Sequence, residues 1–148
     1  MRIVIQRVSQ AQVTIDQEVV GQIGPGLMLL VGVSDQDDQD TVAYMARKIA
    51  NMRIFSDEAG KMNLSVKDIG GAVLSISQFT LYARTKKGNR PSFTDAGQPD
   101  YSNKIYQALN QALSQDYHLP VATGEFGADM QVSLVNDGPV TIILDSEE

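Results

Sequence analysis

Three hydrogen-bonding side chains, those of Ser77, Gln78 and Thr80, stand where an apolar run ends. The run over residues 72–77 predicts a buried strand, and α/β folds place ligands at the carboxyl ends of such strands. Side chains of this kind can hold a polar substrate. The structural alternative is that the two hydroxyls bond to nearby main chain. Spacing alone favours that alternative, because no general base lies nearby in the sequence.

A second candidate is the segment Asn136-Asp137-Gly138-Pro139. These residue types are common turn formers, so an ordinary turn is the simplest interpretation. A cis bond, found at only about 5–6% of X–Pro positions in folded proteins, would turn the two flanking carbonyls to nearly the same side. Such an acceptor pair suits an ammonium group, which has three donors and no acceptor. Residue types alone do not decide between the two interpretations.

Cations cluster in one short stretch of an acidic chain. The net charge is −6, so broad binding to polyanions is not expected. Four of the 12 Lys and Arg residues nevertheless fall between positions 84 and 90, namely Arg84, Lys86, Lys87 and Arg90. This cluster can hold a few phosphates at one place, and the simpler alternative is a solvated surface loop.

No other segment carries a familiar catalytic signature. The chain has no cysteine, which excludes thiolate zinc sites and cysteine nucleophiles. His118 is its one histidine, so sites built from several histidines are excluded. The G-x-S-x-G motif and the phosphate loop are missing, and Gly24-Pro25-Gly26 lacks the third glycine of a dinucleotide fingerprint. We therefore expect neither a metal nor a cofactor.

Length and composition favour one domain over residues 1–148, with 43% hydrophobic residues to form a core. The longest apolar stretch, Leu27–Val31, is far shorter than the roughly 20 residues that span a bilayer. The N-terminus does not show the basic start and apolar run of a signal peptide. We expect a cytoplasmic protein that does not enter the membrane.

The elements that must position these residues are mostly strands. Apolar positions predict strands near residues 3–8, 13–15 and 19–23, and the continuous apolar run Leu27–Val33 predicts a central strand covered on both faces. Further strands are predicted at residues 52–55 and 72–77. Alternation at 130–134 and 140–144 predicts a final strand pair around a tight turn at 136–139.

Two amphipathic helices complete the pattern. Val42, Met45, Ala46 and Ile49 have helical spacing after the acidic stretch 35–40. Pro99 suits the first turn of the second helix, whose apolar face holds Ile105, Ala108, Leu109 and Ala112. The fold class expected from these elements is strand-rich α/β, with two main helices that cover one sheet face.

Several short segments together form a specific signature that runs from Met1 to Thr141. They are Gln6-Arg7-Val8, Arg53-Ile54-Phe55, Gly60-Lys61-Met62-Asn63, Ser77-Gln78-Phe79-Thr80-Leu81, Lys87-Gly88-Asn89-Arg90-Pro91-Ser92-Phe93, Gly124-x-Phe126-Gly127-Ala128-x-Met130 and Asn136-x-Gly138-Pro139-Val140-Thr141. On these segments the chain resembles the D-aminoacyl-tRNA deacylases. It departs from many relatives at Ala83, where they have glycine, and at Ser102, where they often have alanine in Pro-x-x-Ala. Both departures concern the dimensions of the pocket.

The resemblance implies a three-layer β/β/α fold and hydrolysis of the ester between a D-amino acid and the terminal adenosine of tRNA. It also implies a homodimer with active sites at the subunit interface. The Gly138-Pro139 bond should be cis and should reach into the partner's pocket, where its carbonyls hold the α-amino group and exclude L side chains. Glycyl-tRNA, which has no side chain to exclude, is a possible second substrate.

Roles for single residues follow from the same resemblance. The N–H groups of Phe79 and Thr80 would stabilise the oxyanion, while Ser77 and Gln78 position the ester. Thr80 as nucleophile lacks an evident base, so we favour water attack assisted by the 2′-hydroxyl of the tRNA. Further substrate and RNA contacts are expected from two groups of residues, Phe126 and Met130 beside the adenosine, and Arg7, Lys86, Lys87 and Arg90 on phosphates.

Three rival hypotheses remain at this level. The first is a serine or threonine esterase for small D-amino esters, which would depend on Thr80 and not on the tRNA 2′-hydroxyl. The second is an RNA-binding module without activity, with the loop 84–90 as its contact surface. The third is a structural dimerisation domain in which Gly138-Pro139 is only a turn.

Overall fold

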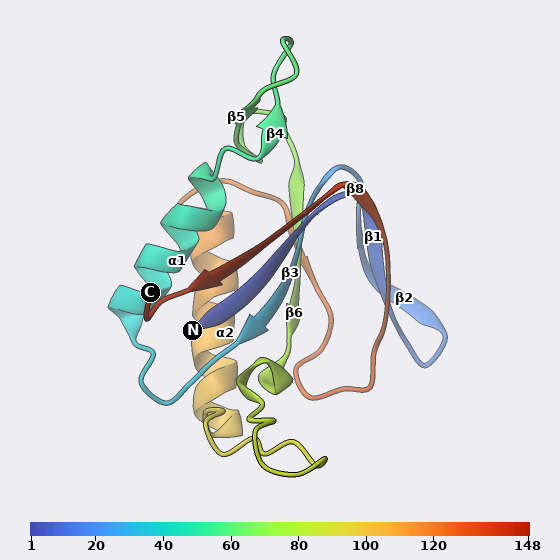
Figure 1. The fold of residues 1–148 in the computed structure, drawn as a ribbon. Coiled ribbons are helices and arrows are strands. Elements are labelled where there is room, and N and C mark those ends of the chain that lie inside the picture. Colours follow the sequence, from blue (N-terminus) through green and yellow to red (C-terminus); the bar gives the residue numbers. More distant parts are fainter.

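A long first strand organises the fold. The computed structural model describes residues 1–148, and in it β1 (Arg2–Ile15) has three antiparallel partners. One edge of β1 pairs first with β3 (Gly26–Gly32) and then with β2 (Glu18–Ile23). Its other edge pairs with β8 (Gln131–Asp145) over nearly the full strand length. β1 therefore belongs to two parts of one bent sheet (Figure 1).

The sheet order is β2-β1-β3-β6-β7, with β8 attached to β1. β6 (Ala72–Ser77) is parallel to β3, and β7 (Val121–Thr123) is parallel to β6. A small hairpin of β4 (Phe55–Ser56) and β5 (Met62–Leu64) projects from one end of the molecule (Figure 1). The strand predicted over residues 72–77 is confirmed, and so is the buried central strand that begins near Leu27.

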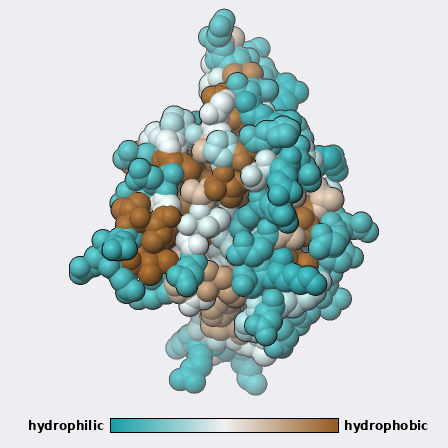
Figure 2. Space-filling model, turned by 180° about the vertical axis from the view of Figure 1, so that it is seen from behind, coloured by the Kyte–Doolittle hydropathy of each residue, from teal (hydrophilic) through white to brown (hydrophobic).

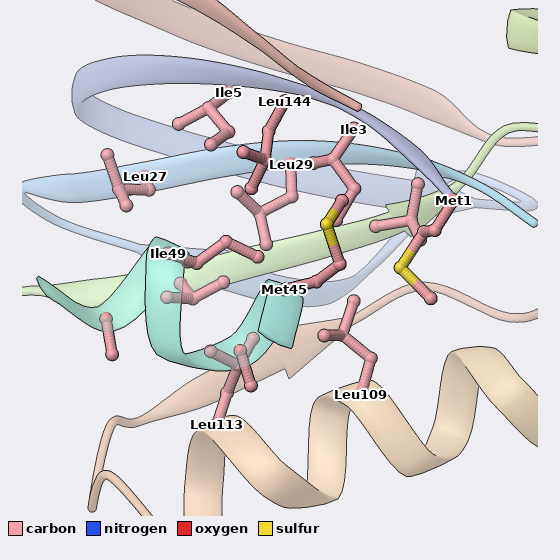
Figure 3. Packing of buried hydrophobic residues seen from close by; sticks show 14 of the residues in the cluster. Met1, Ile3, Ile5, Leu27, Leu29, Met45, Ile49, Leu109, Leu113 and Leu144 are labelled. Carbon is pink, nitrogen blue, oxygen red and sulfur yellow. The ribbon is translucent and has the colours of Figure 1, made fainter. Parts of the chain in front are cut away.

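Side chains that alternate along β3 and β6 enter two different cores. Leu27 and Leu29 face the helices, in a cluster of 22 buried residues (Figure 3). Met28 and Leu74 face the opposite way, toward the second half of β1, in a smaller cluster of six. Helices, central strands and the bent-over strands thus form three layers. The strand-rich α/β class and the β/β/α arrangement expected from the sequence are both confirmed.

Both predicted helices are present, and their apolar faces are the expected ones. α1 (Gln39–Asn51) begins with a capping box between Asp38 and Thr41 and buries Val42, Met45, Ala46, Ile49 and Ala50. α2 (Pro99–Gln115) has its proline in the first turn and buries Ile105 and Leu109, among others. None of the helices combines the length and the apolar character needed to cross a lipid bilayer.

The expectation of a final strand pair around a tight turn is wrong. Residues 131–145 form one strand, β8, and both of its halves pair with β1. Gln6 pairs with Thr141, but Val8 pairs with Asn136, so four residues of β8 stand opposite one residue of β1. We call residues 137–140 the Gly138 bulge. Alternation of apolar residues predicted both halves correctly, but it cannot distinguish a bulge from a turn.

The strand predicted over residues 52–55 is also largely wrong. Met52 caps the end of α1, and only Phe55 lies in a strand, the two-residue β4. The apolar side chains of Ile54 and Phe55 are buried in the helix-side core, which explains the apolar signal without a longer strand.

Gly26 offers a direct test of this packing. A Cβ atom at Gly26 would lie 1.9 Å from the carbonyl oxygen of Ala72, whereas one at Gly24 would meet nothing within 4 Å. We expect Gly26→Ala to lower the free energy of unfolding by about 3 kcal/mol or more, because β3 and β6 must separate. Gly24→Ala should change it by less than about 0.5 kcal/mol. Urea denaturation of both variants is the measurement, and equal stabilities would contradict the strand contact.

Candidate functional site

A cleft of about 820 Å³ opens where β3 and β6 end. Its walls are the strand ends, the loop before α2, and the segment that leads into β8. Five residues expected at the site line it together, namely Ser77, Gln78, Phe79, Phe126 and Met130. We call this hollow the strand-end cleft. A smaller hollow of about 540 Å³ over β1, β2 and β8 contains none of the expected residues.

The floor of the cleft is fixed by the end of β6. The N–H of Gln78 donates to the carbonyl of Val31 at 2.7 Å, and the chain then enters a short 3-10 helix, Phe79–Tyr82. The first N–H groups of a helix have no acceptor within it. The first two N–H groups of this 3-10 helix, those of Phe79 and Thr80, also donate to no main-chain carbonyl of a neighbouring turn or loop. These two donors are therefore free for a substrate.

Thr80 lies next to the cleft but is not among its lining residues. Its Oγ1 accepts a hydrogen bond of 2.5 Å from the side-chain amide of Gln78. An amide nitrogen cannot remove the hydroxyl proton, so this contact orients Thr80 without activating it as a nucleophile.

None of the residues that line the strand-end cleft has a titratable side chain. Tyr82, the last residue of the 3-10 helix, is buried outside the cleft lining, with its ring under the guanidinium of Arg2. Burial, together with the charge of Asp37, raises the pKa of Tyr82 to about 12, so its hydroxyl stays protonated at neutral pH. The cleft therefore offers hydrogen bonds and an apolar surface, but no side-chain general base.

Aromatic and sulfur-containing side chains shape the other walls. The exposed ring of Phe79 meets the edge of Phe93, with ring centroids 5.2 Å apart. Phe126 packs on the buried ring of Tyr106 at 6.0 Å. A Cβ atom at Gly124 would lie 2.3 Å from the sulfur of Met130, so this glycine leaves the room that Met130 needs to line the cleft.

Gly138 and Pro139 lie outside the cleft of their own chain. Both are exposed in the Gly138 bulge, and the bond between them is cis. Arg7 of β1, which lies beside the bulge, pairs with Leu27 of β3. Ser77 of β6 pairs with Val31, four residues further along β3. Four residues along β3 and three strand spacings across the sheet separate the two places by roughly 20 Å. Figure 1 shows the apex of β8 above the central strands and the short 3-10 helix below the lower end of β6.

Arg7 braces the Gly138 bulge. Its Nε donates to the carbonyl of Asp137 at 2.9 Å, and its Nη1 donates to the carbonyl of Ile54 at 2.7 Å. The Arg7 side chain is only 11% exposed. Its expected contact with RNA stays a prediction, and the observed contacts give it a structural role that the sequence pattern did not indicate.

The basic loop is open to solvent. Arg84 and Ser92 close it by paired main-chain hydrogen bonds, and the Arg84 guanidinium is paired with Asp95. Three of the four cations expected to bind RNA lie in this loop, where they are exposed and form no ion pair, namely Lys86, Lys87 and Arg90. The loop leads directly into Phe93 and so borders the cleft. No group of three or more His, Cys, Asp or Glu residues is arranged to hold a metal ion.

Comparison with known proteins identifies the family. Residues 4–145 match the family described as "D-Tyr-tRNA(Tyr) deacylase". The chain belongs to this family. It is a hydrolase of D-aminoacyl-tRNA, and the resemblance inferred from the sequence segments is confirmed.

Two solved structures are similar to the deacylase. One, titled "c-Myc DNA Unwinding Element Binding Protein", shares 42% identity with a TM-score of 0.92 over 99% of both chains. The other, titled "Structural Analysis of a probable eukaryotic D-amino acid tRNA deacylase", has a TM-score of 0.84 over 97% of both chains. Its identity is 16%, so this second likeness concerns the fold alone.

Substitution of Arg7 tests whether it braces the bulge. Arg7→Ala should lower kcat/KM for D-tyrosyl-tRNA by about 10- to 100-fold, because two hydrogen bonds from a charged donor are lost. Arg7→Lys should not restore activity, since an ammonium cannot span the two carbonyls as the guanidinium does. Arg53→Ala is the matched control, because this exposed arginine holds Asn63 in the β4–β5 hairpin. Full rescue by lysine would instead favour a charge contact with RNA.

Proposed function

We propose that the strand-end cleft hydrolyses the D-aminoacyl ester with main-chain donors and without a side-chain base. The proposal is supported above all by a cleft wall that lacks any titratable side chain. The N–H groups of Phe79 and Thr80 stabilise the oxyanion that forms on the acyl carbonyl oxygen. Ser77 and Gln78 orient the ester beside these donors.

Water supplies the nucleophile in this proposal. Its oxygen bonds to the acyl carbon, the bond from that carbon to the ribose O3′ breaks, and the proton released from water passes to O3′. The neighbouring 2′-hydroxyl of the terminal adenosine positions the water and relays the proton, which removes the need for an enzyme base. The Gln78 amide on Thr80 supports this version over attack by Thr80 itself.

Selection against L-amino acids is proposed to require two subunits. The Gly138 bulge lies roughly 20 Å from the cleft of its own chain, a distance estimated from strand spacings. It is exposed and braced by Arg7, so it is available to a second copy of the chain. In the partner's cleft its carbonyls accept hydrogen bonds from the α-amino group, and the main chain leaves no room for an L side chain.

Exposed apolar residues support a homodimer. Ile143 and Val135 on β8 are 65% and 48% exposed, and Phe79 at the cleft mouth is 57% exposed. Hydrophobic residues also gather in patches on the largely hydrophilic face in Figure 2. Residues of this kind are typically covered in stable interfaces.

The basic loop is proposed to hold the acceptor stem. Lys86, Lys87 and Arg90 contact phosphates, while Phe126 and Met130 flank the terminal adenosine. One similar structure is titled as a DNA-binding protein. A broad DNA-binding surface is not expected here, because the net charge is −6 and a third of the cations lie in the short stretch 84–90. We further propose that residues 1–148 form one domain that acts in the cytoplasm without a metal or cofactor. Glycyl-tRNA is proposed as a second substrate.

The chirality proposal is tested with D-tyrosyl-tRNA and L-tyrosyl-tRNA. Release of the D-amino acid should be at least about 100-fold faster, the order of discrimination expected when one enantiomer is sterically excluded. A metal chelator should change neither rate. Hydrolysis of both substrates at one rate would contradict the steric filter, and tRNA binding without release of amino acid would favour a binding module.

The catalytic proposal is tested by separate changes on the enzyme and on the substrate. Thr80→Ala should lower kcat by about tenfold or less, because the main-chain donors remain. A substrate with 2′-deoxyadenosine at its 3′ end should lose about 100-fold or more, since its proton relay is gone. Single-turnover rates for the Thr80→Ala variant and for the 2′-deoxy substrate distinguish water attack assisted by the 2′-hydroxyl from attack by Thr80. The opposite ranking would support the esterase hypothesis, with Thr80 as nucleophile.

A further inference from the structure

Two serine hydroxyls are buried without a hydrogen-bond partner in the protein, those of Ser75 and Ser102. An unpaired buried hydroxyl destabilises a fold, because it has lost its hydrogen bonds with water. Ser75 is fully buried on β6 and does not line the strand-end cleft. Ser102, which is 7% exposed, does line it. Only Ser102 is therefore placed where a bound substrate can supply the missing partner.

The surroundings hold Ser102 firmly in the cleft wall. Its N–H donates to the carbonyl of Gln98 at 2.8 Å in the first turns of α2. The preceding loop is tied down by the bond from the Gly97 N–H to the carbonyl of Val33 at 2.9 Å, and by the bond from the Gln98 N–H to the Asp35 carboxylate at 2.8 Å. A rigid wall of this kind fixes where the Ser102 hydroxyl can act.

Gly97 leaves the space that the hydroxyl occupies. A Cβ atom at Gly97 would lie 2.5 Å from the Ser102 Oγ, so the oxygen rests against a bare Cα atom that can accept no hydrogen bond. One step between staggered rotamers about the Cα–Cβ bond moves a serine oxygen to a new direction. The hydroxyl can thus turn from Gly97 toward a ligand in the cleft without movement of the main chain.

We propose that Ser102 is a substrate-binding residue whose hydroxyl forms a hydrogen bond with the terminal adenosine of the tRNA. This inference rests on the proposed function of the cleft. Thr94 and Gln98 also line the cleft, but both are exposed to solvent. Ser102 is the one polar side chain of the lining that is buried without a hydrogen-bond partner, so it gains most from pairing with a polar nucleoside atom. The ester lies at Ser77–Phe79, and the nucleoside is the part that all aminoacyl-tRNA substrates share.

A change in affinity without a change in chemistry is the expected signature. Ser102→Ala should raise KM about three- to tenfold and leave kcat unchanged, because the hydrogen bond forms equally in the ground and transition states. The factor should be the same for D-tyrosyl-tRNA and D-alanyl-tRNA, since the nucleoside is common to both. The melting temperature should stay the same or rise, because an unpaired polar atom is removed.

Ser75→Ala is the matched control. It removes the other unpaired hydroxyl, so its melting temperature should shift in the same direction, while its KM should equal that of the wild type. An unchanged KM in Ser102→Ala would overturn the proposal. A change confined to one of the two amino acids would also overturn it, because Ser102 would then contact the amino acid side chain.

Equilibrium binding of adenosine 5′-monophosphate separates this inference from the proposed function. Ser102→Ala should weaken that binding three- to tenfold, and Ser75→Ala should leave it unchanged. If the wild type releases no D-amino acid but shows this difference, the catalytic proposal fails and the adenosine contact stands. Equal binding by the wild type and Ser102→Ala overturns the contact, whatever the wild-type turnover.

Discussion

The structure depends on the pairing of β8 with β1, which is interrupted at the Gly138 bulge opposite Arg7 and shifts register once more between Val8 and Gln10. Because β8 follows β1 through its bend, the same pairing builds both the helix-side layer and the bent-over layer. The same pairing also keeps the Gly138 bulge away from the strand-end cleft of its own chain. β8 begins beside the strand-end cleft, which Val132 lines, and carries Gly138 roughly 20 Å away from it by strand spacings.

This separation gives the cleft its chemical character. A cleft without titratable side chains can bind and orient an ester, and it can stabilise negative charge with main-chain donors. It has no carboxylate to pair with an ammonium group and no side-chain base. We propose that the second subunit supplies the acceptors for the ammonium group and that the RNA supplies the proton relay. In this proposal the enzyme recognises features that every D-aminoacyl-tRNA shares, independently of the side chain.

Much of this organisation could be predicted from local patterns. Apolar periodicity identified α1, α2 and the strand that ends at Ser77, because each reflects burial of one face of one element. The bulge could not be predicted in this way, since Asn136–Pro139 are turn formers and only the distant partner β1 decides that the strand continues. The role of Ser102 likewise depends on Gly97 and on the end of β3, contacts that no local pattern encodes.

The central claim is that each active site combines one chain's cleft with the other chain's bulge, and mixed dimers test it most directly. Ala128→Trp blocks the cleft, Gly138→Val disrupts the bulge, and each homodimer should be inactive. Co-expression of the two variants should restore about a quarter of the wild-type activity, because half of randomly paired dimers contain one intact composite site. Failure of mixed dimers, isolated by two different tags, to hydrolyse D-tyrosyl-tRNA would contradict the account.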